Sequence, residues 1–534
     1  MARKTAVPWL WLLLAVGITS LPYLIVYATT PPGQIFTATL INPDDTSVYL
    51  SAMRQGLEGK WLFHFQFSPE LITPKVMYMP YILAGHLAAW LGGSLVMWFH
   101  FWRAAAGLVT LLVLWGWLAF VFPNQRRWQL SAWLLIVFGS GFGWLVAVVT
   151  GKPLHLIPDL GISEWGMVMP LLDTPHFALA PGLLTGVFGY VVKTCRSGNG
   201  RNWAAAALCG FLLGLVYPYL VPVAAVVTAV YILVRTGQQR RINWLEWGGA
   251  LLFAAGLLPF VFYYGVWTRR DANWASTHVT NNVIPSPTPW AILLAFGLVG
   301  LLALYGAVLW LRQKREPFVL VWAGVQFLLL YFPLPYAGRF LMGLIVPVGT
   351  LAGYGLEAGL LPRLAKRLNT SFWHKVSPEP LATVRRVLLI LTVPSTVMVV
   401  LFLCQVAFVR ADYPLFLPQA DETAVQWLTT HTTVEDVVFA AYPVGNYLPR
   451  LSPARVFVGQ PFLTVDLDNK LALQAQFWQP ETTEAWRQAF LAEWGITYVY
   501  VGSYERPLLS QNNTPPGERV YARDGVEIYA IPQR

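Results

Sequence analysis

The chain has 534 residues, of which 56% are hydrophobic and 12% charged, and its mean hydropathy is +0.52. Soluble domains carry roughly 25% charged residues, so this composition excludes an ordinary soluble enzyme. Apolar runs of about 18–23 residues recur along the chain and indicate a polytopic membrane protein. The net charge of +10 does not indicate nucleic-acid binding, because Lys and Arg cluster in short loops between apolar runs.

The first apolar run extends from Val7 to about Ala28 and follows Arg3 and Lys4. It is long for a signal peptide and no A-x-A cleavage site follows it, so we expect an uncleaved span with a cytoplasmic N-terminus. A polar and aromatic loop, 29–75, comes next. The ionisable residues of this loop include Asp44, Asp45, Glu58, His64 and Glu70.

Asp44 and Asp45 are adjacent acids in a chain that carries few charges. Crowding two carboxylates raises the pKa of at least one of them. A chain therefore keeps such a pair for chemistry, for cation binding, or because a solvent-exposed loop makes the electrostatic cost of the pair small. Apolar residues recur at helical spacing from Asp45 to Trp61, which places the pair at a helix N-terminus. Capping that helix explains one acid and not both.

About eleven crossings are expected in all, with 76–95 as a half-inserted or interfacial helix. After the first, the expected spans are 98–122, 128–149, 177–194, 202–235 as two short helices, 245–267, 289–311, 318–333, 340–361 and 387–409. A second polar loop, 150–176, carries Asp173 and His176. Lys and Arg collect in alternate loops, 362–386 among them, which places 29–75, 150–176 and 410–534 outside the cytoplasm.

Residues 410–534 have ordinary soluble composition. Helical patterns cover 421–431 and 483–494, and strand patterns cover 437–440, 455–458, 496–501 and 526–531, which together predict a small α/β domain. The three cysteines, Cys195, Cys209 and Cys404, lie in or beside apolar runs, so no disulfide framework is expected. The predicted fold is therefore a polytopic α-helical membrane domain, 1–409, followed by an extracytoplasmic α/β domain, 410–534.

The chemistry available on the outer face limits the candidate reactions. Nucleotide sugars and ATP are absent there, and polyprenyl-phosphate lipids are the activated sugar donors. A transferase at that face needs a base for the acceptor hydroxyl, a role that suits Asp44 or Asp45. It also needs cations for the leaving phosphate, a role that suits Arg339, which is predicted on the same side.

Several motifs occur in an order that resembles the GT-C membrane glycosyltransferases, which include protein O-mannosyltransferases and lipid A aminoarabinose transferases. They are Asp44-Asp45-Thr46-Ser47-Val48-Tyr49 continuing to Gly56-Leu57-Glu58-Gly59-Lys60-Trp61, then Gly210-Phe211-Leu212-Leu213-Gly214 with Tyr217-Pro218-Tyr219, then Arg339-Phe340 followed by Pro347. The resemblance covers roughly residues 1–410, and some members also have a C-terminal extracytoplasmic domain.

The resemblance implies an inverting transfer from a polyprenyl-phosphate sugar to a glycan, lipid or protein acceptor, in the inner or plasma membrane. One acid of the first loop would be the catalytic base or a ligand of a divalent metal ion. If Asp45 is the first acid of the family's motif, Tyr49 stands at the aromatic position, but Thr46 then stands at the position of the second acid. If Asp44 and Asp45 are instead aligned with the acid pair, the aromatic residue comes one position late. The choice between Asp44 and Asp45 therefore stays open.

Further candidates for substrate contact are Arg339, Glu70, His64, His176 and Asp173, each weighed against an ordinary structural role such as an interfacial anchor or a cap. Two other functions compete with transfer. A transporter or flippase for a lipid-linked substrate would place ionisable residues at mid-membrane. A non-catalytic envelope assembly protein would use 410–534 as its binding module.

The charge asymmetry predicts opposite sidedness for two positions. Reporter fusions at Asn369 and Gln533 should report a cytoplasmic and an extracytoplasmic location, respectively, because Lys and Arg concentrate on the side of 362–386. If both fusions reported the same side of the membrane, the orientation assigned to the loop 29–75 would be contradicted, because that orientation rests on the same distribution of Lys and Arg.

Overall fold

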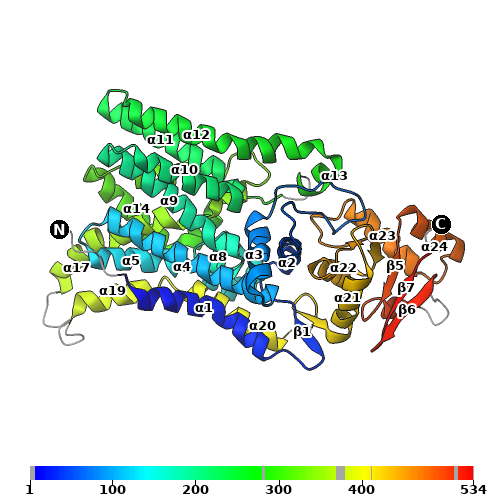
Figure 1. Ribbon diagram of the computed structural model, residues 1–534. Helices are drawn as coiled ribbons and strands as arrows, with labels where there is room; N and C mark the ends of the chain where they lie inside the picture. The colour runs from blue at the N-terminus through cyan, green and yellow to red at the C-terminus, as the bar shows by residue number, and fades with distance from the viewer. Residues whose placement is uncertain (1–6, 280–282, 369–378, 410–411, 510–514, 533–534) are drawn as a thin grey trace. The chain divides into compact units, whose positions relative to one another are not determined.

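The computed structural model describes residues 7–279, 283–368, 379–409, 412–509 and 515–532 (Figure 1). Arg3, Lys4, part of the basic loop 362–386 and the proposed fusion sites Asn369 and Gln533 lie outside these ranges. The chain forms two compact units. We call Met1–Pro22, Phe101–Tyr264 and Ile284–Cys404 the helical unit, and Tyr23–His100, Gly265–Val283 and Gln405–Arg534 the sheet unit.

The helical unit is built almost entirely from apolar helices, and α1, α4 and α20 continue from it into the sheet unit. Its helices are α1 (Trp9–Ala28), α4 (Leu95–Val121), α5 (Arg126–Val137), α6 (Gly143–Thr150), α7 (Pro158–Gly161), α8 (Val168–Leu172), α9 (Pro175–Ser197), α10 (Arg201–Val216), η2 (Pro218–Leu220), α11 (Val221–Gln239), α12 (Trp244–Phe262), α14 (Pro289–Arg312), α15 (Phe318–Leu329), η6 (Ala337–Leu341), α16 (Ile345–Tyr354), α17 (Leu361–Leu368), α19 (Pro380–Ile390) and α20 (Pro394–Val409).

Within the described residues, seven helices are long and apolar enough to cross a membrane, or eight if the bent pair α19 and α20 counts as one span. The expected eleven crossings are therefore not confirmed. Three further apolar helices, Met79–Leu91, Arg201–Val216 and Phe318–Leu329, are shorter than the roughly 20 residues that a span requires. The polytopic helical character expected from composition is present.

The expected span 128–149 is instead two helices, α5 and α6, separated by a break. Ser140 in the break donates its backbone N–H to the carbonyl of Thr392 across 2.6 Å. A side chain on Gly141 would meet the carbonyl oxygen of Ala295 at 2.2 Å. Asp159 Oδ2 accepts the backbone N–H groups of Gly141 and Gly143, each across 3.1 Å. Hydropathy does not reveal this break, because its cause is close packing and side-chain bonding to the backbone.

The sheet unit contains helices packed against both faces of a five-stranded sheet. Its elements are β1 (Gln34–Phe36), α2 (Pro43–Leu57), α3 (Met79–Leu91), α13 (Ala272–Trp274), β2 (Phe416–Pro418), α21 (Gln419–His431), β3 (Val437–Phe439), α22 (Tyr442–Tyr447), η8 (Leu448–Arg450), β4 (Arg455–Val456), α23 (Leu467–Trp478), α24 (Glu484–Glu493), β5 (Tyr498–Val501), β6 (Glu518–Arg523) and β7 (Val526–Ala530). The strand order is β4-β3-β5-β7-β6.

Strand β3 pairs in parallel with β4 and β5, and β7 pairs antiparallel with β5 and β6. Alternate residues of β3 enter two cores, because successive side chains point to opposite faces. Val438 packs with α21 through Leu428, whereas Phe439 packs with α23 and α24 through Phe477 and Phe490. The four expected strands and two expected helices are present, and the additional strands and α-helices are β2, β6, α22 and α23.

The sheet unit contains residues 410–534 together with the first polar loop, 29–75. Strand β1 pairs antiparallel with β2, with Ile35 opposite Leu417. The backbone N–H of Val456 donates to the carbonyl of Gln66 across 2.9 Å. The loop 29–75 and the C-terminal segment therefore build one folded body.

Helices α2 and α3 approach each other through two glycines. A Cβ on Gly56 would lie 2.1 Å from the carbonyl oxygen of Ile82, and one on Gly85 would lie 2.0 Å from that of Met53. Both obstructing atoms belong to the backbone, so neither can rotate away. The glycines thus set the distance between α3 and the helix that begins with the acid pair.

We expect Gly85→Ala to destabilise the protein by about 1–3 kcal/mol, because the added methyl must push α3 away from α2. The thermal unfolding midpoint of the purified full chain measures this change. Gly116→Ala is the matched control, since nothing lies within 4 Å of a Cβ built there. Equal midpoints for the two variants would contradict the close approach.

Candidate functional site

Asp44 and Asp45 occupy the first turn of α2, and neither is its cap. The N-cap is Asn42, in a left-handed conformation with φ 49° and ψ 55° and without a side-chain capping bond, and Pro43 follows as the first helical residue. Proline suits that position because its fixed φ matches the helix and its missing N–H would be unpaired there. Neither acid therefore occupies the N-cap position, and the helix dipole favours both carboxylates in the first turn.

The Asp44 carboxylate is held through one of its oxygens. Tyr442 donates its hydroxyl hydrogen to Oδ1, and Asn446 donates to the same oxygen through Nδ2 across 3.3 Å. Asn446 is oriented in turn by a 2.7 Å bond from Nδ2 to the hydroxyl of Tyr413. Among the described residues, no donor contacts Oδ2 of Asp44, and this atom is not enclosed. A fixed carboxylate with one open oxygen can accept a proton from a bound molecule.

Burial raises the pKa of Asp44 above its ordinary value, and the Tyr442 hydrogen bond and the positive charge of Arg450 oppose that rise. Arg450 is itself buried and donates to Ser47 Oγ through Nε and Nη2, across 3.0 and 2.9 Å. It also donates to the carbonyl of Thr37. This arginine therefore attaches η8 to α2 and supplies a positive charge near the acid.

Asp45 has a different environment. Gln460 donates to its Oδ1 through Nε2 across 2.9 Å. The aromatic residue of the motif, Tyr49, is buried and stacks on Tyr81 of α3 with ring centroids 4.5 Å apart. The aromatic position of the motif therefore serves the packing between α2 and α3.

Two other predicted residues of the first loop lie in separate networks. Glu70 forms an ion pair with Lys470, whose side chain is 0% exposed and which also donates to Ser68 Oγ across 3.0 Å. His64 exchanges two backbone hydrogen bonds with the side chain of Gln55, across 2.8 and 2.9 Å. Burial, followed by the charges of Lys60 and Arg54, lowers the pKa of His64. The structure thus gives Glu70 and the backbone of His64 roles in joining segments of the sheet unit.

Arg339 belongs to a cluster in the helical unit. Its Nη1 lies 3.2 Å from Glu164 Oε1, and its guanidinium stacks 4.6 Å from the ring centre of Tyr219. The same oxygen of Glu164 accepts the hydroxyl of Tyr217 across 3.1 Å. Arg339 and Tyr219 stand near the first residues of the span candidates Ala337–Ala365 and Pro218–Gln239, so the cluster lies at span ends.

His176 and Asp173 lie at the start of α9. His176 Nδ1 shares a 2.8 Å hydrogen bond with Thr174 Oγ1, and its ring centre is 5.9 Å from that of Tyr217. The structure therefore connects His176 to the Arg339 cluster. Asp173 is fully buried at the C-cap of α8, and the N-cap of α9 is Thr174. Asp173 is thus not the cap of α9.

The sequence did not identify Tyr442, Asn446 and Gln460, which lie about 400 residues beyond the acids they contact. No local pattern marks them. Glu164 and Tyr217 stand in the second polar loop and in the Tyr-Pro-Tyr motif, so a search for acids facing Arg339 could have found them. Among the described residues, no group of three or more His, Cys, Asp or Glu is arranged to hold a metal ion.

The sequence matches no protein-family model and no curated protein sequence. Its fold does match solved structures. The apo oligosaccharyltransferase of Archaeoglobus fulgidus aligns with a TM-score of 0.55 and 12% identity, over 93% of this chain and 70% of that one. ArnT from Cupriavidus metallidurans, bound to undecaprenyl phosphate, aligns with a TM-score of 0.52 and 13% identity, over 98% of both chains.

The arabinofuranosyltransferase AftD from mycobacteria aligns with a TM-score of 0.57 and 15% identity, over all of this chain and 41% of that one. All three proteins are GT-C glycosyltransferases. The chain therefore has the GT-C fold, which confirms the resemblance at the level of fold. These identities are too low to carry activity or residue roles from the three proteins to this chain.

The ion pair of Glu70 generates a prediction. Glu70→Gln should lower stability by about 3–5 kcal/mol, because it leaves the enclosed ammonium of Lys470 without its counter-charge. The unfolding midpoint of the full chain measures the loss, and Glu70→Gln combined with Lys470→Met should recover part of it. Glu481→Gln, at an exposed position of the same unit, is the control. An unchanged midpoint with a raised KM would instead assign Glu70 to substrate.

Proposed function

We propose that the protein is an integral membrane glycosyltransferase that moves a sugar from a polyprenyl-phosphate donor to an acceptor hydroxyl on the extracytoplasmic face, with inversion. The observation that carries this proposal is the Asp44 carboxylate, fixed at Oδ1 by Tyr442 and Asn446 and open at Oδ2. The GT-C fold supports it, as does the undecaprenyl phosphate bound by a structure of that fold.

In the proposed reaction, Oδ2 of Asp44 takes the proton of the acceptor hydroxyl as the hydroxyl oxygen attacks the anomeric carbon of the sugar. The bond from that carbon to the donor phosphate oxygen breaks, and the lipid phosphate departs with the electron pair. A single displacement of this kind inverts the anomeric centre. Proton removal by a positioned carboxylate contributes about 10²–10⁴ in rate.

Asp44 suits the base role better than Asp45. Its Oδ1 is occupied by two neutral donors, which fix the carboxylate without neutralising it. Burial raises its pKa, and a base whose pKa lies nearer the working pH takes a proton more effectively. We assign Asp45 a positioning role through its bond to Gln460, a residue of the segment between β4 and α23.

We further propose that Arg339 contacts the donor phosphate. Guanidinium groups bind phosphate oxygens through paired charge-assisted hydrogen bonds. Glu164 and Tyr219 hold the Arg339 side chain from two directions, which fixes its orientation before a ligand arrives. Tyr217 shares the same Glu164 oxygen and completes the support.

The position of the acids favours transfer over transport. Asp44 and Asp45 lie on α2, which belongs to none of the candidate spans. Transporters place their ionisable groups near mid-membrane on broken helices. The charged residue inside α4, Arg103, instead donates to the carbonyls of Thr19 and Leu171, across 3.0 and 2.7 Å, as a structural bridge.

We expect Asp44→Asn to reduce transfer by about 10²–10⁴ at pH values above the pKa of Asp44 while the unfolding midpoint is kept, because an amide still accepts from Tyr442 and Asn446 but cannot take a proton. The measurement is label transfer or hydrolysis by the purified full chain with radiolabelled polyprenyl-phosphate sugars. In the native protein, activity should fall as the pH drops through the pKa of Asp44, which burial raises above 3.8.

Asp45→Asn is the matched control, because Asn can still accept from Gln460. It should keep the acidic limb of the pH profile and lose less rate than Asp44→Asn. Full turnover by both variants and by the double variant would contradict the transferase assignment at these positions. A larger loss in Asp45→Asn, with the acidic limb abolished, would move the base to Asp45.

A further inference from the structure

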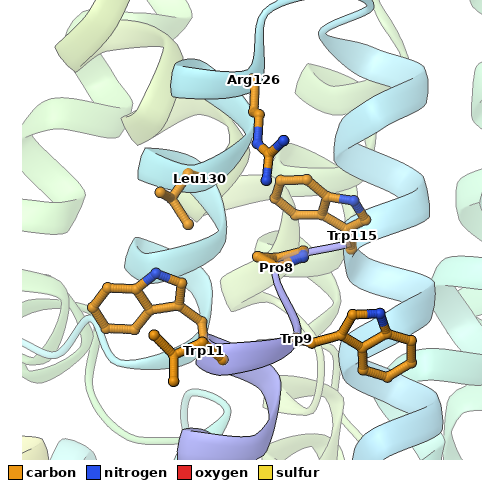
Figure 2. A pocket seen from close by; sticks show the side chains of 7 residues that line it. Pro8, Trp9, Trp11, Trp115, Arg126 and Leu130 are labelled. Carbon is orange, nitrogen blue, oxygen red and sulfur yellow. The ribbon is translucent and has the colours of Figure 1, made fainter. Parts of the chain in front are cut away.

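A cavity of about 260 Å³ lies in the helical unit, between the start of α1, the end of α4 and the start of α5. Arg126 is the one ionisable side chain of its lining, which also contains Trp9, Trp11 and Trp115 (Figure 2). An exposed arginine at the start of a helix is not by itself a binding site. The buried acids of the sheet unit make contacts that reach the candidate base.

Asp421 and Glu505 are both 0% exposed, and both accept backbone N–H groups of the turn that follows β5. Gly502 N–H donates to Glu505 Oε2 across 2.9 Å, and Ser503 N–H donates to Asp421 Oδ1 across 3.2 Å. Asp421 Oδ1 also accepts the hydroxyl of Tyr500 across 2.7 Å. Burying two carboxylates beside one turn costs free energy, so the bonds that each carboxylate makes must offset that cost.

Glu505 extends from this turn to the start of α22. Its Oε1 accepts the backbone N–H of Ala441, which is the N-cap residue of α22. Ala441 follows β3 and Gly502 follows β5, and because these two strands pair in parallel, their carboxyl ends lie at the same edge of the sheet. Among the described residues, Asp421 makes no bond to α22. The two acids therefore differ in what they fix.

Helix α22 has only six residues, so its direction depends on tertiary contacts more than on its own hydrogen bonds. One such contact is at Gly445, where a Cβ would lie 2.0 Å from the carbonyl oxygen of Val458. The bond from Ala441 N–H to Glu505 is another, and it fixes the first turn. A carboxylate suits this place because it offers one oxygen to each of two N–H donors, whereas an amide has a single acceptor oxygen.

The first turn of α22 also orients the candidate base. Tyr442, the residue after Ala441, donates its hydroxyl hydrogen to Asp44 Oδ1, and Asn446 donates to the same oxygen from one turn later. A displacement of Ala441 would therefore move both donors relative to Asp44.

We propose that Glu505 is a positioning residue for the base: its carboxylate fixes Ala441, and α22, which starts there, presents Tyr442 and Asn446 to Asp44. Glu505 is fully buried and acts through the helix, not on the substrate. The inference rests on the proposed function, in which Asp44 takes the proton of the acceptor hydroxyl.

Glu505→Gln should lower kcat for transfer about 10–100-fold and leave the KM for the polyprenyl-phosphate donor unchanged, because the base is displaced while donor binding is not. Tyr442→Phe should lower kcat on the same scale. The double variant should lose far less than the product of the two losses, because both changes act on one contact. Burial raises the pKa of Glu505 to about 7, so the purified full chain is assayed at about pH 8.5, where the carboxylate predominates.

Deuterium uptake by the backbone of residues 440–447 gives a readout that does not require turnover. Uptake should rise in Glu505→Gln and stay at the wild-type level in Asp421→Asn. Asp421→Asn is the matched control, because it changes the second buried acid of the same turn without touching α22; its kcat should stay near that of the wild type even if its unfolding midpoint falls. Glu505→Asp, which keeps the charge on a shorter side chain, should lie between the wild type and Glu505→Gln in both readouts.

Three results would overturn the positioning role: an equal loss of kcat in Asp421→Asn, a double-variant loss equal to the product of the single losses, or unchanged uptake by 440–447 in Glu505→Gln. If Glu505→Gln does not fold, Glu505→Asp takes its place in each comparison. A loss of kcat in Asp44→Asn and Tyr442→Phe with a native kcat in Glu505→Gln overturns this inference alone. A native kcat in Asp44→Asn and Tyr442→Phe rejects the proposed base, and the positioning role with it.

Discussion

A helix that is buried on every side must have its polar side chains paired, and α2 is such a helix, with every residue from Thr46 to Gly56 buried. Its partners come from the C-terminal segment. Ser47 accepts from Arg450, and Arg54 donates to the carbonyl of Pro449 across 3.2 Å. An unpaired buried polar group costs about 1–3 kcal/mol, so α2 and this segment depend on one another. The two aspartates sit at the end of the helix that this pairing fixes.

The same pairing explains the geometry of the candidate base. A first-turn acid that capped α2 would bond its own helix, whereas Asp44 accepts from α22. The carboxylate is therefore oriented by a tertiary contact, and the glycine contact of α2 with α3 fixes the helix from another direction. Orientation of this kind is what positioned general bases require.

The features that the sequence predicted are those that depend on local pattern. Apolar runs gave the helical character, alternation gave strands such as β3 and β5, and adjacency made Asp44 and Asp45 conspicuous. The count of spans and the break after α5 could not be read from hydropathy, because packing at Gly141 decides the latter. The partners of the acids are non-local, and so is Lys470, which forms the ion pair with Glu70.

The dependence of α2 on residues about 400 positions later bears on synthesis. The aspartates leave the ribosome early, and Tyr442, Asn446, Arg450 and Gln460 follow only after the membrane helices have been made. During that interval the polar groups of α2 are without the partners of the finished fold. A chain that terminates after the end of α20 at Val409 but before Tyr442 would contain the apolar helices and still lack the residues that orient Asp44. The orientation of Asp44, the proposed base, thus waits until α22 has been synthesised.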